Sequence, residues 1–111
     1  MKVDEQQHDG VKVLLPQGPL VGADADYLES HFVRVLNENH KAVVLDISGV
    51  PYVDSRGLEV LVEATERLIR SGRALKLCGV NDMLREVLDL TEVASMFEQF
   101  EDVVAALGSA G

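Results

Sequence analysis

One segment restricts the possible folds of this chain more than any other. The six residues from Ala42 to Ile47 are apolar except for Asp46, and half of them are β-branched. A run this short and this apolar is typical of a strand that is covered on both faces. It therefore predicts an α/β fold in which helices pack on the two sides of a sheet.

Short apolar segments alternate with segments of helical spacing along the rest of the chain. Strands are expected at 11–15, 20–21, 42–47, 74–78 and 96–97. Helices are expected to begin at Asp24, after Val53, at Asn81, and at Glu101 or Asp102, with Gly72 ending the second helix in a left-handed conformation. The apolar positions expected to face the core from these helices are Leu28, Phe32, Val35 and Leu36; Leu58, Leu61, Val62, Thr65, Leu68 and Ile69; Leu84, Val87, Leu88 and Leu90; and Val103, Val104 and Leu107.

The order of these elements favours a single α/β domain. The sheet is expected to be mixed and partly parallel, with four to five strands and about four helices. Residues 1–9 are polar and are predicted to form a loosely ordered N-terminal tail, with the domain covering 10–111. Sites in such sheets cluster beyond the carboxyl ends of the strands, which directs attention to the loop from Ser48 to Gly57.

Within that loop, Asp54-Ser55-Arg56-Gly57 stands at the start of the clearest helix. Serine is a favoured helix N-cap, so Ser55 is open to a purely structural interpretation. The same position also suits a phosphate, because a helix N-terminus offers free N–H groups and a partial positive charge. A phosphate there would add about −1.5 to −2 charges to a docking surface without unfolding the domain.

The neighbours of Ser55 allow two interpretations each. Gly57 either leaves room for an approaching kinase or lets the helix pack closely against a strand. Arg56 is either a solvated surface residue or a partner for a phosphate on Ser55, and it could also hinder a kinase.

The stretch from Val43 to Leu61, VVLDISGVPYVDSRGLEVL, resembles the signature of STAS domains, especially bacterial anti-sigma-factor antagonists. The resemblance extends over about residues 11–107. It implies that Ser55 is phosphorylated by a partner that is both an anti-sigma factor and a serine kinase, and that a PP2C-type phosphatase removes the phosphate. The unphosphorylated protein would bind that partner and so regulate transcription indirectly.

The resemblance also implies a set of partner-binding residues. By position these are Asp46, Asp54, Ser55, Arg56 and Gly57, together with Asp24 as the acid near the first turn. This chain departs from the family in two places. Arg56 stands where relatives commonly have Ser or Thr, and Pro19 and Val21 stand where relatives often have acids.

Composition narrows the remaining classes of function. A net charge of −9 and an aromatic content of 5% disfavour direct binding of nucleic acid. Cys78 is the only cysteine and is expected to be buried, and the three histidines, His8, His31 and His40, form no metal-binding pattern. We expect no enzyme, cofactor or metal, no insertion into a membrane, and a cytoplasmic location. The alternative function is a cytosolic STAS subunit of a lipid or anion transport complex, in which Ser55 has a structural role.

Overall fold

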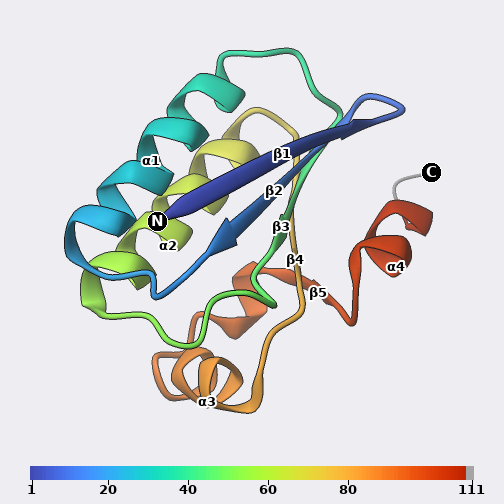
Figure 1. The fold of residues 1–111 in the computed structure, drawn as a ribbon. Helices are drawn as coiled ribbons and strands as arrows, with labels where there is room; N and C mark the ends of the chain where they lie inside the picture. The colour runs from blue at the N-terminus through green and yellow to red at the C-terminus, as the bar shows by residue number, and fades with distance from the viewer. Residues whose placement is uncertain (110–111) are drawn as a thin grey trace.

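A computed structural model describes residues 1–109 of the chain, and its centre is a sheet of five strands in the order β1-β2-β3-β4-β5 (Figure 1). The strands are β1 (Lys2–His8), β2 (Val11–Gln17), β3 (Ala42–Asp46), β4 (Leu75–Cys78) and β5 (Glu98–Phe100). Strands β2 to β5 run parallel to one another, and β1 is an antiparallel edge strand paired with β2. The sheet is therefore mixed and mostly parallel, as the sequence predicted.

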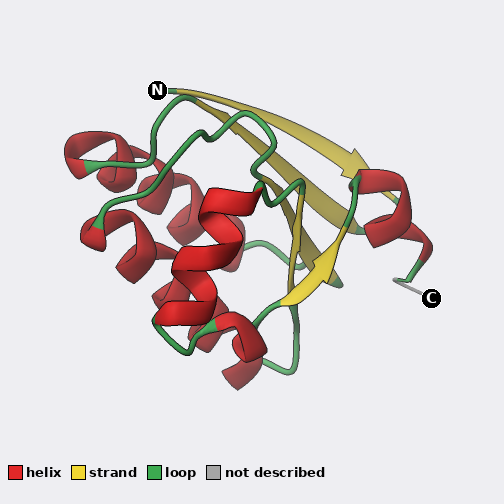
Figure 2. Ribbon diagram, turned by 90° about the horizontal axis from the view of Figure 1, so that it is seen from below, coloured by secondary structure: helices red, strands yellow, loops and turns green. Residues whose placement is uncertain are grey.

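The helices cover both faces of this sheet. They are α1 (Gly22–Leu36), α2 (Ser55–Arg70), α3 (Asp82–Leu90) and α4 (Val103–Gly108), with a 3₁₀ turn at Ala94–Met96. Helices α1 and α2 lie side by side on one face, and α4 lies on the opposite face (Figures 1 and 2). Buried side chains of α3 join the core on the α1–α2 side.

Strand β3 separates two apolar layers, which explains its unusual composition. Val43 and Leu45 point into the larger layer beneath α1 and α2, whereas Val44 points into the smaller layer beneath α4. All three side chains are completely buried. The prediction of a strand covered on both faces is confirmed.

Three of the four α-helices begin with an acidic or amide side chain that accepts a hydrogen bond from a free backbone N–H group. Asp54 caps α2, Asn81 caps α3 and Asp102 caps α4. The first helix differs from the sequence prediction, because its N-cap is Val21 and Asp24 lies inside the first turn. The predicted left-handed conformation of Gly72 is confirmed by its φ of 74°.

The two ends of the chain depart most from the sequence predictions. Lys2–His8 form the edge strand β1 in place of a loosely ordered tail, because seven backbone pairings with β2 hold this polar segment. Residues 20–21 form no strand, and Leu20 makes only an isolated bridge to Val53. The last strand is Glu98–Phe100 rather than 96–97.

Three apolar side chains that were predicted to face the core lie outside it. Ile69, Leu90 and Val104 are 56%, 76% and 79% exposed, respectively. Each lies in the last turn of its helix or on the outer side of the short α4. At these positions helical spacing continues, but no neighbouring element covers the side chain.

Candidate functional site

The loops at the carboxyl ends of the parallel strands are joined by backbone hydrogen bonds. Leu20 donates to the carbonyl of Tyr52 (N···O 3.0 Å), and Asp54 donates to the carbonyl of Leu20 (3.3 Å). Gly18 donates to the carbonyl of Gly49 at 2.9 Å. The loop that begins at Ser48 therefore lies where the sequence predicted, but it ends at Asp54, because Ser55 to Gly57 already belong to α2. It is fixed against the segment that leads into α1.

Asp54 ties the beginnings of two helices together. Its Oδ1 accepts from the Gly57 N–H in α2 at 2.8 Å, and its Oδ2 accepts from the Gly22 N–H in α1 at 3.0 Å. The bond from Gly57 is the main reason that the pKa of the Asp54 carboxyl lies below its usual value. Both oxygens thus have backbone partners, and this carboxylate orients the surface around Ser55.

Ser55 is the first residue of α2 and its side chain is exposed. The sequence left open whether Ser55 itself caps the helix. In the structure the cap is Asp54, and the Ser55 hydroxyl takes no part in the bonds that join α2 to α1 among residues 1–109. This oxygen therefore faces water at a helix N-terminus without carrying the capping role.

Arg56 turns sideways from α2 towards α1. Its guanidinium contacts three carboxylates: Asp26 (Nε···Oδ1 2.8 Å), Glu29 (Nη2···Oε1 3.0 Å) and Glu59 (Nη1···Oε1 2.6 Å). We call these three residues the Arg56 cage. The hydrogen bond to Asp26 is the largest cause of the raised pKa of Arg56. The interpretation of Arg56 as a freely solvated residue is wrong, because ion pairs on two helices hold it.

Gly57 is buried where α2 crosses the segment before α1. A Cβ atom at this position would lie 2.2 Å from the carbonyl oxygen of Leu20, closer than any side chain tolerates. The close-packing interpretation of Gly57 thus has a definite physical cause. The same carbonyl accepts from the Asp54 N–H, so glycine at position 57 leaves room for this hydrogen bond between the two loops.

The other two predicted acids lie at the same end of the sheet and have structural partners. Asp46 ends β3, and its Oδ1 accepts from the Ser48 N–H at 3.0 Å. Asp24 lies 2.9 Å from the amino group of Met1. The structure brings Asp54, Ser55, Arg56 and Gly57 together, whereas Asp24 and Asp46 contribute to neighbouring turns.

Sequence reasoning missed the three members of the Arg56 cage as one group. None of Asp26, Glu29 and Glu59 was predicted to belong to the site. The local signal was the spacing of three residues between Arg56 and Glu59, which places the two side chains close together on a helix. Nothing in the sequence alone brings α1 beside them.

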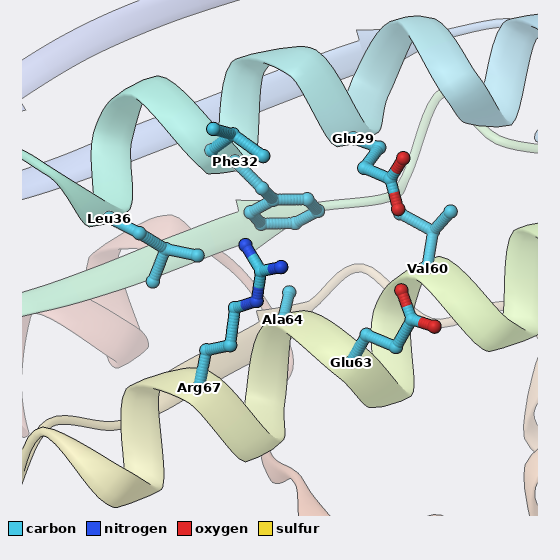
Figure 3. Close-up of a pocket in the computed structure, with 8 residues that line it drawn as sticks. Glu29, Phe32, Leu36, Val60, Glu63, Ala64 and Arg67 are labelled. Atoms are coloured by element: carbon cyan, nitrogen blue, oxygen red, sulfur yellow. The ribbon is translucent and has the colours of Figure 1, made fainter.

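A groove between α1 and α2 continues from this site along the same face. Figure 3 shows the ring of Phe32 between the two helices, with Glu29 and Glu63 towards one end and Arg67 towards the other. The open space is about 10 Å³, near the minimum for one water molecule. The groove is therefore filled by side chains and is too small for a ligand.

Other candidate groups offer little chemistry. Cys78 is completely buried, and this burial raises the pKa of its thiol to about 12, as expected for a structural cysteine. Within residues 1–109, no group of three or more His, Cys, Asp and Glu side chains is arranged to hold a metal ion. Over the same residues, no helix has the length and apolar character that crossing a bilayer requires.

Known proteins resemble this chain in sequence and in fold. The family model of the STAS domain matches residues 2–106. The chain is 29% identical over 97 residues to the Bordetella bronchiseptica protein named "Putative anti-sigma factor antagonist BtrV", covering 87% of this chain and 84% of that protein.

Two solved structures extend the comparison. An anti-sigma factor antagonist from Mycobacterium paratuberculosis superposes with a TM-score of 0.88 at 25% identity, covering 98% of this chain and 92% of that chain. A sulfate transporter family protein from Wolinella succinogenes superposes with a TM-score of 0.79 at 26% identity, covering 93% and 86%. The chain therefore belongs to the STAS domain family, and the proteins that it resembles include anti-sigma factor antagonists.

Proposed function

We propose that this chain is a protein-binding module that is switched by phosphorylation of Ser55. In the unmodified state it binds an anti-sigma factor that is also a serine kinase, and it thereby regulates transcription indirectly. The kinase transfers the γ-phosphoryl group of ATP to Ser55 Oγ, releasing ADP. A PP2C-type phosphatase hydrolyses the phosphoserine and restores the binding form.

The observation that carries this proposal is the division of roles between Asp54 and Ser55. Asp54 caps α2 and accepts a hydrogen bond from the first residue of α1, so modification of the exposed Ser55 hydroxyl removes no capping bond. A phosphate at the first position of α2 also lies near the positive end of the helix dipole. The fold is therefore expected to tolerate the phosphate, while the surface that a partner contacts changes in charge and hydration.

The first experiment measures binding to the anti-sigma factors of the native cell. We expect wild type and Ser55→Ala to bind one of them with similar affinity and Ser55→Asp to bind at least about tenfold more weakly, the effect of about 1.4 kcal/mol of repulsion and desolvation. Ser95→Asp is the matched control, because Ser95 is also exposed but lies in the 3₁₀ turn. Its affinity should equal that of wild type.

The second measurement is mass spectrometry of the chain after incubation with the same partner and ATP. Phosphate should appear on Ser55 and not in the Ser55→Ala variant. If Ser55→Asp binds as well as wild type and no partner adds phosphate at residue 55, the proposed switch is rejected.

The likeness to the Wolinella sulfate transporter family protein supports a second candidate function. In this case the chain is a STAS subunit of a lipid or anion transport complex, and Ser55 is a fixed contact. Affinity purification from the native cell separates the two functions. Recovery of an ABC-type ATPase or an anion transporter favours transport, whereas recovery of a serine kinase favours the switch.

A further inference from the structure

The cage uses every nitrogen of the Arg56 guanidinium. Nε, Nη1 and Nη2 each lie within 3.0 Å of an oxygen of a different carboxylate. One positive charge is thus surrounded by three negative charges, so the four side chains together carry −2. The positive charge of Arg56 is therefore already more than neutralised.

The cage also connects two helices. Asp26 and Glu29 belong to α1, and Arg56 and Glu59 belong to α2. The Arg56 side chain is about one-third exposed, and Asp26 and Glu59 are more than half exposed, so these ion pairs lie at the surface and solvent screens them. Together with the hydrogen bonds that the Asp54 carboxylate accepts from Gly22 and Gly57, these ion pairs hold α1 beside the start of α2.

Ser55 and Glu59 lie on the same helix, α2. Ser55 lies four residues before Glu59, a spacing that places two side chains on the same face of a helix. A phosphate on Ser55 would therefore lie near the Glu59 carboxylate and next to Asp54. The three carboxylates already take three of the five N–H groups of Arg56, so they compete with that phosphate for the guanidinium.

We propose that Arg56 is a positioning residue that the carboxylates of Asp26, Glu29 and Glu59 withhold from a phosphate on Ser55. The modified surface then keeps its full added negative charge, so phosphorylation causes a large loss of affinity for the partner. This inference rests on the proposed function, because it concerns regulation through Ser55. The position of Arg56 beside Ser55 suggests pairing with the phosphate, whereas the three carboxylates oppose that pairing.

The test measures the second pKa of phosphoserine, ordinarily about 6. Phosphoserine is incorporated at position 55 during translation, so that no kinase is needed, and the ³¹P NMR signal is followed against pH. In the otherwise unaltered protein, Arg56→Met should raise this pKa only slightly. In the Asp26→Asn/Glu59→Gln double variant, Arg56 keeps only its ion pair with Glu29, and it should pair with the phosphate and lower the phosphate pKa by about one pH unit.

The decisive comparison adds Arg56→Met to the open-cage double variant, which should abolish most of the decrease. Glu63→Gln is the control, because it removes a negative charge from α2 outside the cage. If Arg56→Met alone raises the phosphate pKa by a full unit, and opening the cage adds nothing, then Arg56 already pairs with the phosphate and the proposal is wrong. Amide NMR spectra of each variant check that the fold is retained.

Binding measurements separate this inference from the function on which it rests. If phosphoserine at 55 leaves binding to every anti-sigma factor unchanged, the proposed switch fails, whatever the ³¹P result. If phosphoserine weakens binding, the open-cage double variant should lose less affinity on modification than wild type does. An equal loss in both proteins would contradict the role assigned to the cage.

Discussion

The two ends of the parallel sheet are built in different ways. At the carboxyl ends of the strands, helices begin, and Asp54, Asn81 and Asp102 accept hydrogen bonds from their free N–H groups. At the amino ends, α1 and α2 finish and leave free carbonyl groups. Arg73 donates there to the carbonyls of Leu36 (3.1 Å) and Glu38 (3.2 Å) at the end of α1.

The charged side chains at the two ends differ in the same sense. A cavity of about 290 Å³ at the amino ends is lined by Lys41, Arg73, Lys76 and the single acid Glu98, among others. The carboxyl end instead holds the Arg56 cage, with three acids around one cation. Of these two clusters, the one at the amino ends of the strands is more basic, and the one at the carboxyl ends, which carry Ser55, is more acidic.

This difference follows from topology and the helix dipole. In a parallel sheet with helical crossovers, every helix runs back against the strands, so the helix N-termini gather at the strands' carboxyl ends. Acidic side chains are favourable near N-termini and basic ones near C-termini. Part of the acidity around Ser55 therefore stabilises the fold, and a net charge of −9 is not by itself evidence of a basic partner.

The largest effect is expected for Gly57→Ala at the acidic end. The new methyl group would clash with the Leu20 carbonyl and separate α2 from the loop. It would also weaken the hydrogen bond from the Asp54 N–H to that carbonyl. We expect a loss of about 3 kcal/mol in the free energy of unfolding. Urea denaturation followed by circular dichroism measures it.

The control for this variant is Gly108→Ala, where an added Cβ meets no atom of residues 1–109 within 4 Å. Its stability should be close to that of wild type. A Gly57→Ala protein as stable as Gly108→Ala would show that close packing at Leu20 does not hold this end together.

A smaller effect is expected for Asp54→Ala, which removes the acceptors for the Gly22 and Gly57 N–H groups. The melting temperature should fall by on the order of 5 °C, the typical consequence of losing a helix cap. Asp54→Asn is the matched control, because its amide oxygen can still accept from Gly57. It should recover part of the loss.

The effect of Asp54 also depends on pH in a defined direction. Its pKa is lowered in the folded state, chiefly by the bond from Gly57. The stabilisation is therefore complete above the ordinary aspartate pKa of about 3.9 and disappears as the pH falls through the lower folded value. Melting curves of wild type and Asp54→Ala should converge in that acidic range. A constant difference across it would contradict a role for the ionised carboxylate.

The smallest of these effects is expected at the basic end, for Arg73→Met. This change removes two bonds to the carbonyls that end α1 but keeps most of the apolar stem. We expect a loss of about 0.5 kcal/mol, measured by urea denaturation. Arg70→Met is the control, because exposed Arg70 pairs only loosely with Glu66 at 3.7 Å, and its effect should be smaller. If the two variants are equally stable, Arg73 does not cap α1.

The candidate site was only partly predictable from the sequence. The position of Ser55 at the start of a helix followed from local signals, namely the short strand Ala42–Asp46, the loop after it and the helical spacing from Leu58 onward. Whether Asp54 or Ser55 would cap the helix did not follow, because both side chains are good caps and they are adjacent. The second bond of Asp54, to Gly22, decides between them, and it joins residues 32 positions apart.

The amino-acid order by itself determined the alternation of strands and helices, the strand covered on both faces and the glycine that ends α2, because these depend on periodicity and backbone preference within a few residues. Only the tertiary structure decided that polar Lys2–His8 become an edge strand, that Gly57 has no room for a side chain, and that Arg56 pairs with two acids from another helix. Each of these depends on a neighbour distant in sequence, whose hydrogen bonds, volume or charge no local pattern contains.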